Sequence, residues 1–136
     1  MIVIDSSSLA KYLLREAGWE VISQYIRRGS VYSLDHALKE VSNAIWRHYC
    51  LKKAIEASKA KELYQALRKL IKAGAIILES EEQYIDEAVE ISIEHHLTVY
   101  DSLYIAQAFH RRNALLTSDK KQAKIAEKMN IRTILT

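Results

Sequence analysis

The sequence predicts an α/β protein, a three-layer α/β/α sandwich around a central, mostly parallel sheet of about five strands. Five short apolar runs show no alternation with polar residues, which is typical of strands buried on both faces. Segments with helical periodicity separate these runs, and this order is typical of βαβ units. A length of 136 residues suits one domain, so we expect residues 1–136 to form a single domain.

The first half of the chain alternates in this way. Its expected elements are, in order, a strand at 1–4, helices at 7–15 and 18–28, a strand at 31–33, and a helix from 34 or 35 to 51. Gly29 ends the second helix. The long helix is predicted from apolar residues at helical spacing, among them Leu38, Val41 and Ile45.

The second half continues the pattern. Its expected elements are, in order, a helix at 57–73, a strand at 75–78, helices at 81–95 and 101–112, a strand at 114–117, a helix at 119–129, and a strand at 131–135. Gly74 separates the first helix from the strand that follows it. With no proline and only three glycines in the chain, we expect short connections and no flexible linker.

The composition excludes several classes of protein. A hydrophobic fraction of 49% and a charged fraction of 27% are typical of globular rather than disordered or membrane proteins. No run approaches the roughly 20 apolar residues that span a bilayer, and the N-terminus has no secretory signal pattern. One cysteine allows no internal disulfide. We therefore expect a cytoplasmic protein that does not contact a membrane.

Three aspartates occupy similar places in the pattern. Asp5, Asp101 and Asp119 each follow an apolar run and open a helical segment, which is the position at the end of a strand. An aspartate there often only caps the helix. In open parallel sheets, however, ligands bind outside the carboxyl ends of the strands, so distant residues converge there. Three such residues together indicate a shared acidic pocket.

Glu40 is a fourth acidic candidate, and it lies inside a helix where it cannot act as a cap. It belongs to a polar row with His36, Asn43 and Arg47, at helical spacing beside the apolar stripe. This row is either a solvated helix face or the edge of a binding crevice. In the second case Asn43 would hold Glu40 or contact a substrate phosphate, and Arg47 would contribute to a positive approach surface.

Four clustered carboxylates would repel one another strongly without a cation. Their oxygen ligands, with no cluster of Cys or His, suit Mg²⁺ or Mn²⁺ better than zinc. We expect Asp5 and Asp101 to be direct ligands, with Glu40 and Asp119 acting directly or through water. The net charge of +3 is mildly basic, and acids withdrawn into a metal site would leave a more positive surface, which favours a polyanionic partner.

Taken together, four motifs resemble the PIN-domain family, and within it the VapC-type toxins of toxin–antitoxin pairs. They are IVIDSS ending at residue 7, EVSNAIWR at 40–47, YDSLYIA at 100–106 and LLTSDK at 115–120. The resemblance implies an Mg²⁺- or Mn²⁺-dependent endoribonuclease whose acids are Asp5, Glu40, Asp101 and Asp119. It also implies that the site uses the hydroxyls of Ser7 and Thr117, which we expect to bind the substrate. A homodimer and inhibition by a small antitoxin are implied as well.

Other functional classes remain open at this stage. A receiver domain or a haloacid-type phosphotransferase also places an aspartate after the first strand, although neither explains Glu40. A PIN-like module that binds RNA or protein without cleaving is a further alternative. A dinucleotide-binding domain is disfavoured because the turn after the first strand contains no glycine.

Overall fold

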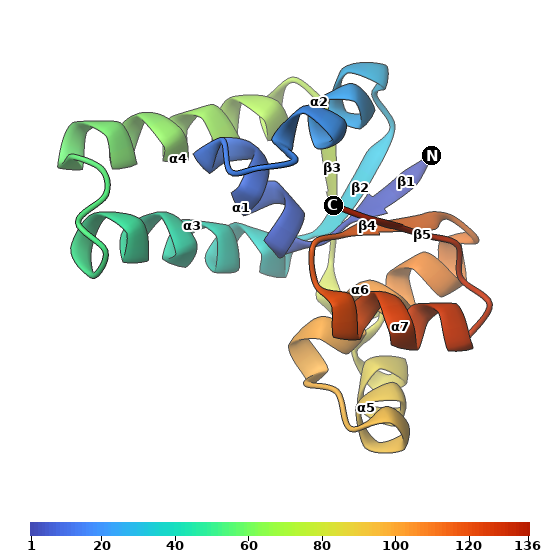
Figure 1. Cartoon of the computed structure of the whole chain (residues 1–136). Coiled ribbons are helices and arrows are strands. Elements are labelled where there is room, and N and C mark those ends of the chain that lie inside the picture. The colour runs from blue at the N-terminus through green and yellow to red at the C-terminus, as the bar shows by residue number, and fades with distance from the viewer.

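A computed structural model describes all 136 residues and contains a five-stranded sheet between two groups of helices (Figure 1). The strands are β1 (Ile2–Ile4), β2 (Val31–Leu34), β3 (Ile76–Glu79), β4 (Ala114–Thr117) and β5 (Thr133–Leu135). Their order is β3-β2-β1-β4-β5, and every neighbouring pair is parallel. The predicted three-layer α/β/α sandwich with a parallel sheet is confirmed.

The helices divide between the two faces of the sheet. They are α1 (Ser6–Leu14), α2 (Trp19–Arg28), α3 (Asp35–Cys50), α4 (Ala57–Lys72), α5 (Ile85–His95), α6 (Val99–Arg111) and α7 (Lys120–Lys128), with a short 3₁₀ helix, η1 (Glu81–Gln83). Helices α1 to α4 cover one face, and α5 to α7 cover the other (Figure 1). This follows from the strand order. The chain crosses the sheet in one direction from β1 to β3 and in the other direction from β3 to β5, and right-handed crossovers in opposite directions lie on opposite faces.

The strand order reverses between β1 and β4, which makes the carboxyl ends of these two strands the switch point of the sheet. Both strands lie at the centre of the hydrophobic core. The side chains of Val3, Ile4, Leu115 and Leu116 are completely buried. Residues that directly follow β1 and β4 are therefore attached to the most rigidly packed part of the molecule.

One predicted junction is wrong. The run LTVY at 97–100 does not form a strand, and Asp101 is not at a strand end but is the third residue of α6. Thr98 caps this helix by accepting a hydrogen bond of 3.2 Å from the Asp101 amide. The run is apolar because Leu97 is buried in the core and Val99 packs against it, where α5 meets α6.

A smaller difference concerns the helix predicted at 81–95. It begins as the 3₁₀ helix η1 and continues as α5 only from Ile85. Ser80 caps η1, since its hydroxyl accepts from the Glu82 amide at 3.2 Å. None of the helices has the length and apolar character that crossing a bilayer requires.

Candidate active site

Asp5 is the most buried of the four acidic candidates, with 3% of its surface exposed. It directly follows β1 and caps α1, because its Oδ1 accepts a hydrogen bond of 3.0 Å from the Ser8 amide. The Ser7 hydroxyl lies 2.8 Å from both carboxylate oxygens and donates to them. The Thr117 hydroxyl, at the end of β4, lies 2.6 Å from Oδ2. Asp5 is therefore held by donors from the first turn of α1 and from the end of β4.

The Thr117 hydroxyl is shared among three groups. Its oxygen lies 2.6 Å from Asp5 Oδ2 and 2.8 Å from Gln122 Oε1, and it accepts from the Asp119 amide at 3.0 Å. A hydroxyl carries only one hydrogen, so Thr117 cannot donate to Asp5 and Gln122 at once. When Asp5 is protonated, it donates to Thr117, and Thr117 then donates to Gln122. When Asp5 is ionised, Thr117 donates to Asp5 instead, and this hydrogen bond stabilises the charge.

The pKa of Asp5 is raised in the folded protein. Burial raises the pKa of this carboxyl from its ordinary value of 3.8 to about 6, although hydrogen bonds from Thr117, Ser8 and Ser7 oppose the rise. The negative charge of Asp101 adds to it. The ionised form of Asp5 is thus costly in the isolated protein, and a neighbouring cation would lower that cost.

Asp101 and Asp119 lie near Asp5 and Thr117, on the group of helices that covers the other face of the sheet. Asp119 follows β4 and caps α7, because its Oδ1 accepts from the amides of Lys121 and Gln122 at 2.9 and 3.1 Å. The buried Gln122 side chain donates to the Asp101 carbonyl oxygen at 2.8 Å. Burial raises the pKa of Asp101, and the negative charges of Asp119 and Glu40 raise it further. Charge effects therefore link Asp101 to each of the other three carboxylates.

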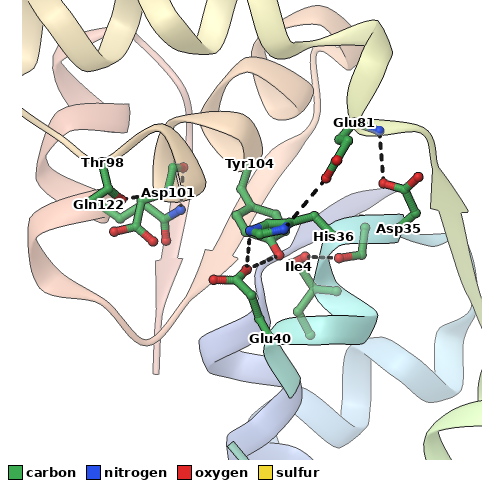
Figure 2. Close-up of polar contacts among 10 residues, drawn as sticks. Ile4, Asp35, His36, Glu40, Glu81, Thr98, Asp101, Tyr104 and Gln122 are labelled. Carbon is green, nitrogen blue, oxygen red and sulfur yellow. Dashed lines mark hydrogen bonds and ion pairs between the residues drawn. The ribbon is translucent and has the colours of Figure 1, made fainter. Parts of the chain in front are cut away.

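Glu40 reaches the same region from α3. The Tyr104 hydroxyl donates to Glu40 Oε1 at 2.7 Å (Figure 2). His36 Nε2 lies 3.1 Å from the same oxygen, but it is not aligned for a hydrogen bond, so Tyr104 makes the contact that orients Glu40. His36 is 6% exposed, so at this part of the helix the alternative of a solvated polar face does not hold.

Most of the other predicted residues line a groove between α1 and α3. It has a volume of about 360 Å³, and its lining includes Ser7, Glu40, Asn43 and Arg47. Asn43 and Arg47 are exposed, and their side chains make no hydrogen bond to the rest of the protein, so both are free to meet a ligand. Thr117 is different, because it is fully buried behind Asp5 and therefore acts through Asp5 rather than by direct contact with a substrate.

The model of the PIN-domain family matches residues 2–128 of the chain. The protein belongs to the PIN-domain family. The match runs from β1 to the end of α7 and so includes all four acidic residues. The predicted resemblance to this family is therefore confirmed.

Individual relatives agree with this assignment. Ribonuclease VapC3 of Pyrobaculum aerophilum is 27% identical over 124 residues, which are 90% of this chain and 92% of the relative. The crystal structure of PAE2754 from Pyrobaculum aerophilum aligns with a TM-score of 0.73 at 18% identity and covers 97% of this chain and 82% of that one. FitAcB from Neisseria gonorrhoeae aligns with a TM-score of 0.65 at 17% identity, over 98% and 96%. These two structures share the fold.

The donor atoms of this PIN domain suit a hard divalent cation that keeps most of its water. No group of three or more His, Cys, Asp or Glu side chains is arranged to hold a metal ion by itself. Mg²⁺ rarely needs such a cage, since it is usually bound by one or two carboxylates and several waters. The candidate ligands are all oxygen atoms, which fit that type of site and do not fit zinc. Ionised Asp5 is costly in the isolated protein, and a bound cation would lower that cost.

Two residues that support the site were not predicted. Tyr104 orients Glu40, and Gln122 joins Thr117 to the start of α6. Each lies three residues after an acidic candidate, so a search for polar residues one helical turn beyond Asp101 and Asp119 would have found them. Burial, followed by the charge of Glu40 and the hydrogen bond to it, raises the pKa of the Tyr104 hydroxyl, which therefore stays protonated and donates.

Removing the hydroxyl of Tyr104 tests its contact with Glu40. We expect Tyr104→Phe to lower the free energy of unfolding by about 1 kcal/mol, because one hydrogen bond to a carboxylate is lost from a buried ring. Urea denaturation measures the change. Tyr64→Phe is the matched control, since the Tyr64 hydroxyl makes no hydrogen bond and its ring is 37% exposed. Equal effects of the two changes would contradict an orienting role for Tyr104.

Proposed function

We propose that this PIN domain is an Mg²⁺- or Mn²⁺-dependent endoribonuclease that hydrolyses RNA phosphodiester bonds. The observation that supports it best is the grouping of partly or fully buried carboxylates at one place. Burial is the main cause that raises the pKa of Asp5 and of Asp101, and the charge of Asp101 adds to the rise at Asp5, while the charges of Asp119 and Glu40 add to the rise at Asp101. Such a concentration of negative charge beside a strand switch point is what a bound cation would stabilise. The relative named Ribonuclease VapC3 supports the choice of RNA.

The proposed roles follow from the positions of the side chains. Asp5 and Asp101 hold the cation directly, and Glu40 and Asp119 hold it through water or orient the attacking water. When bound, a divalent cation there polarises the phosphate and lowers the pKa of a water molecule. Ser7 and Thr117 fix the Asp5 carboxylate with their hydroxyls. Asn43 and Arg47, exposed along the groove, contact the RNA phosphates.

Asp101→Asn tests this proposal directly. The purified protein is incubated with single-stranded RNA, with Mg²⁺ or Mn²⁺ and with a chelator. We expect cleavage only with the metal, and a loss of at least about a hundredfold in the Asp101→Asn variant, because a neutral amide cannot replace a cation ligand. Asp86→Asn is the matched control, since Asp86 also lies in the first turn of a helix but is exposed on α5.

Two results would refute the proposal. Cleavage that persists in the chelator would exclude the metal-dependent mechanism, and equal activity of the Asp101→Asn and Asp86→Asn variants would exclude the site. Phosphoryl transfer to Asp5 would instead favour an aspartate-based phosphotransferase. RNA binding without cleavage in any metal would favour the non-cleaving PIN module.

We also propose that the protein is the toxin of a VapBC-type pair, works as a homodimer and is inhibited by a small antitoxin. The relative's name, VapC3, and the resemblance of the motifs support this assignment. A mostly apolar groove of about 510 Å³ between α1 and α4 offers a surface for an apolar segment of the antitoxin. A short protein encoded beside this gene is expected, and adding it should suppress the RNA cleavage. Sedimentation of the protein alone tests the dimer.

A further inference from the structure

Tyr100 is an exposed aromatic residue at the edge of the acidic site. It lies in the first turn of α6, directly before Asp101, and 61% of its surface is exposed. An aromatic ring left in water contributes little to the core. Its position, together with the groups behind it, indicates a contact with a ligand.

The ring of Tyr100 is held in place by a buried partner. His36 stacks on it with the ring centroids 5.1 Å apart and the planes at 15°. The His36 ring is itself buried, with Nε2 3.1 Å from Glu40 Oε1 and Nδ1 3.7 Å from Glu81 Oε2 (Figure 2). One face of Tyr100 is thus covered by a ring that also touches a site carboxylate, while much of the remaining surface is open to solvent.

The charge of the site explains why such a ring is useful. Four carboxylates repel the phosphates of an approaching RNA, so affinity has to come from groups around them. Stacking of a base on an aromatic ring needs no charge, tolerates any base, and increases affinity about five- to hundredfold per base. Tyr100 offers this contact one residue from Asp101.

The exposed aromatic residues of α3 do not share this position. Trp46 and Tyr49 line a separate groove between α3 and α4, together with Tyr64. Glu40 and Asn43 line the groove on the α1 side of the same helix. Tyr100 is therefore the exposed ring whose stacking partner contacts the acidic site.

We infer that the open face of Tyr100 is a stacking platform for a nucleobase of single-stranded RNA next to the bond that is cleaved. This inference rests on the proposed ribonuclease function and adds a residue that positions the substrate. His36 supports the platform by holding the ring of Tyr100 parallel to its own.

The test compares Tyr100→Leu, Tyr100→Trp and Phe109→Leu. Leucine keeps an apolar contact with His36 but has no aromatic face, whereas tryptophan keeps the face. Phe109 is the matched control, because it is 47% exposed near the other end of α6. Cleavage of single-stranded RNA gives KM and kcat separately. Fluorescence of an RNA oligonucleotide containing 2-aminopurine, bound to the Asp101→Asn protein, reports stacking without cleavage.

For Tyr100→Leu we expect KM to rise by about tenfold or more with kcat changed less than about twofold, and the fluorescence quenching to disappear. Tyr100→Trp should restore both, and Phe109→Leu should change neither. Unchanged KM and quenching in Tyr100→Leu would overturn the inference while leaving the nuclease proposal intact. A Tyr100→Leu variant that differs from the wild type only in its oligomeric state would also overturn the inference. An inactive wild-type protein would refute the nuclease proposal, and the quenching would then still decide whether the base stacks.

Discussion

Asp5→Asn is expected to increase the free energy of unfolding by about 2 to 3 kcal/mol near neutral pH in a chelator, while it abolishes RNA cleavage. The folded protein raises the pKa of Asp5 from 3.8 to about 6, and each pKa unit corresponds to about 1.4 kcal/mol. Asparagine removes the cost of an ionised group at a position that is 3% exposed. Its amide can also donate to Thr117 Oγ1, which leaves the Thr117 hydrogen for Gln122.

The pH dependence of stability gives a second measurement. Because the pKa of Asp5 is higher in the folded than in the unfolded protein, the folded state binds this proton more tightly. The contribution to stability is fully present below pH 3.8 and is lost as the pH rises through about 6. Urea denaturation across this range should show the wild type losing stability relative to Asp5→Asn as the pH increases.

Asp86→Asn is again the control, since an exposed aspartate should change stability by less than about 0.5 kcal/mol. Added Mn²⁺ should stabilise the wild type but not Asp5→Asn, because only the carboxylate binds the ion tightly. A wild type that is more stable than Asp5→Asn at neutral pH in a chelator would show that ionised Asp5 is not under strain. The ionised carboxylate that the reaction needs therefore lowers the free energy of unfolding, as is common for buried functional groups.

The sequence predicts most of the fold because apolar periodicity reports burial. Buried runs such as that of β1 indicate strands correctly, since a parallel sheet hides both faces. The same signal fails at 97–100, where Leu97 and Val99 are apolar because they pack at the meeting of two helices. Periodicity over four residues cannot distinguish these cases.

The candidate site could be predicted only in part. Asp5 and Asp119 occupy the expected positions after strands, and Glu40 lies within the expected helix. Tyr104 was missed because its hydrogen bond to Glu40 joins residues 64 positions apart and depends on how α6 packs over the sheet. Gln122 stands three residues after Asp119, as in a capping box, yet its side chain bonds to Thr117 and to the Asp101 carbonyl instead. Local patterns do not specify such long-range partners.

Thr117→Val is expected to lower the free energy of unfolding by about 3 kcal/mol or more. Valine has nearly the shape of threonine, so packing is kept while the hydroxyl is lost. Gln122 Oε1 and the Asp119 amide then lose their partner, while Asp5 Oδ2 keeps only the hydroxyl of Ser7. Each buried polar group left unpaired costs about 1 to 3 kcal/mol. The hydrogen bond from Thr117 is also the largest influence that lowers the pKa of Asp5, so this pKa should rise further.

Thr117→Ser separates the hydroxyl from the methyl group. It keeps the hydrogen-bonding oxygen and removes one buried methyl, which costs about 1 kcal/mol. Urea denaturation should therefore rank wild type, Thr117→Ser and Thr117→Val in order of decreasing stability. Because protonated Asp5 binds a cation poorly, the pH at which cleavage reaches half its maximum should shift upward in Thr117→Val and stay near the wild-type value in Thr117→Ser. If the two variants lose equal stability and keep the same pH profile, the hydroxyl network does not hold Asp5, and the burial of this carboxylate alone governs its charge.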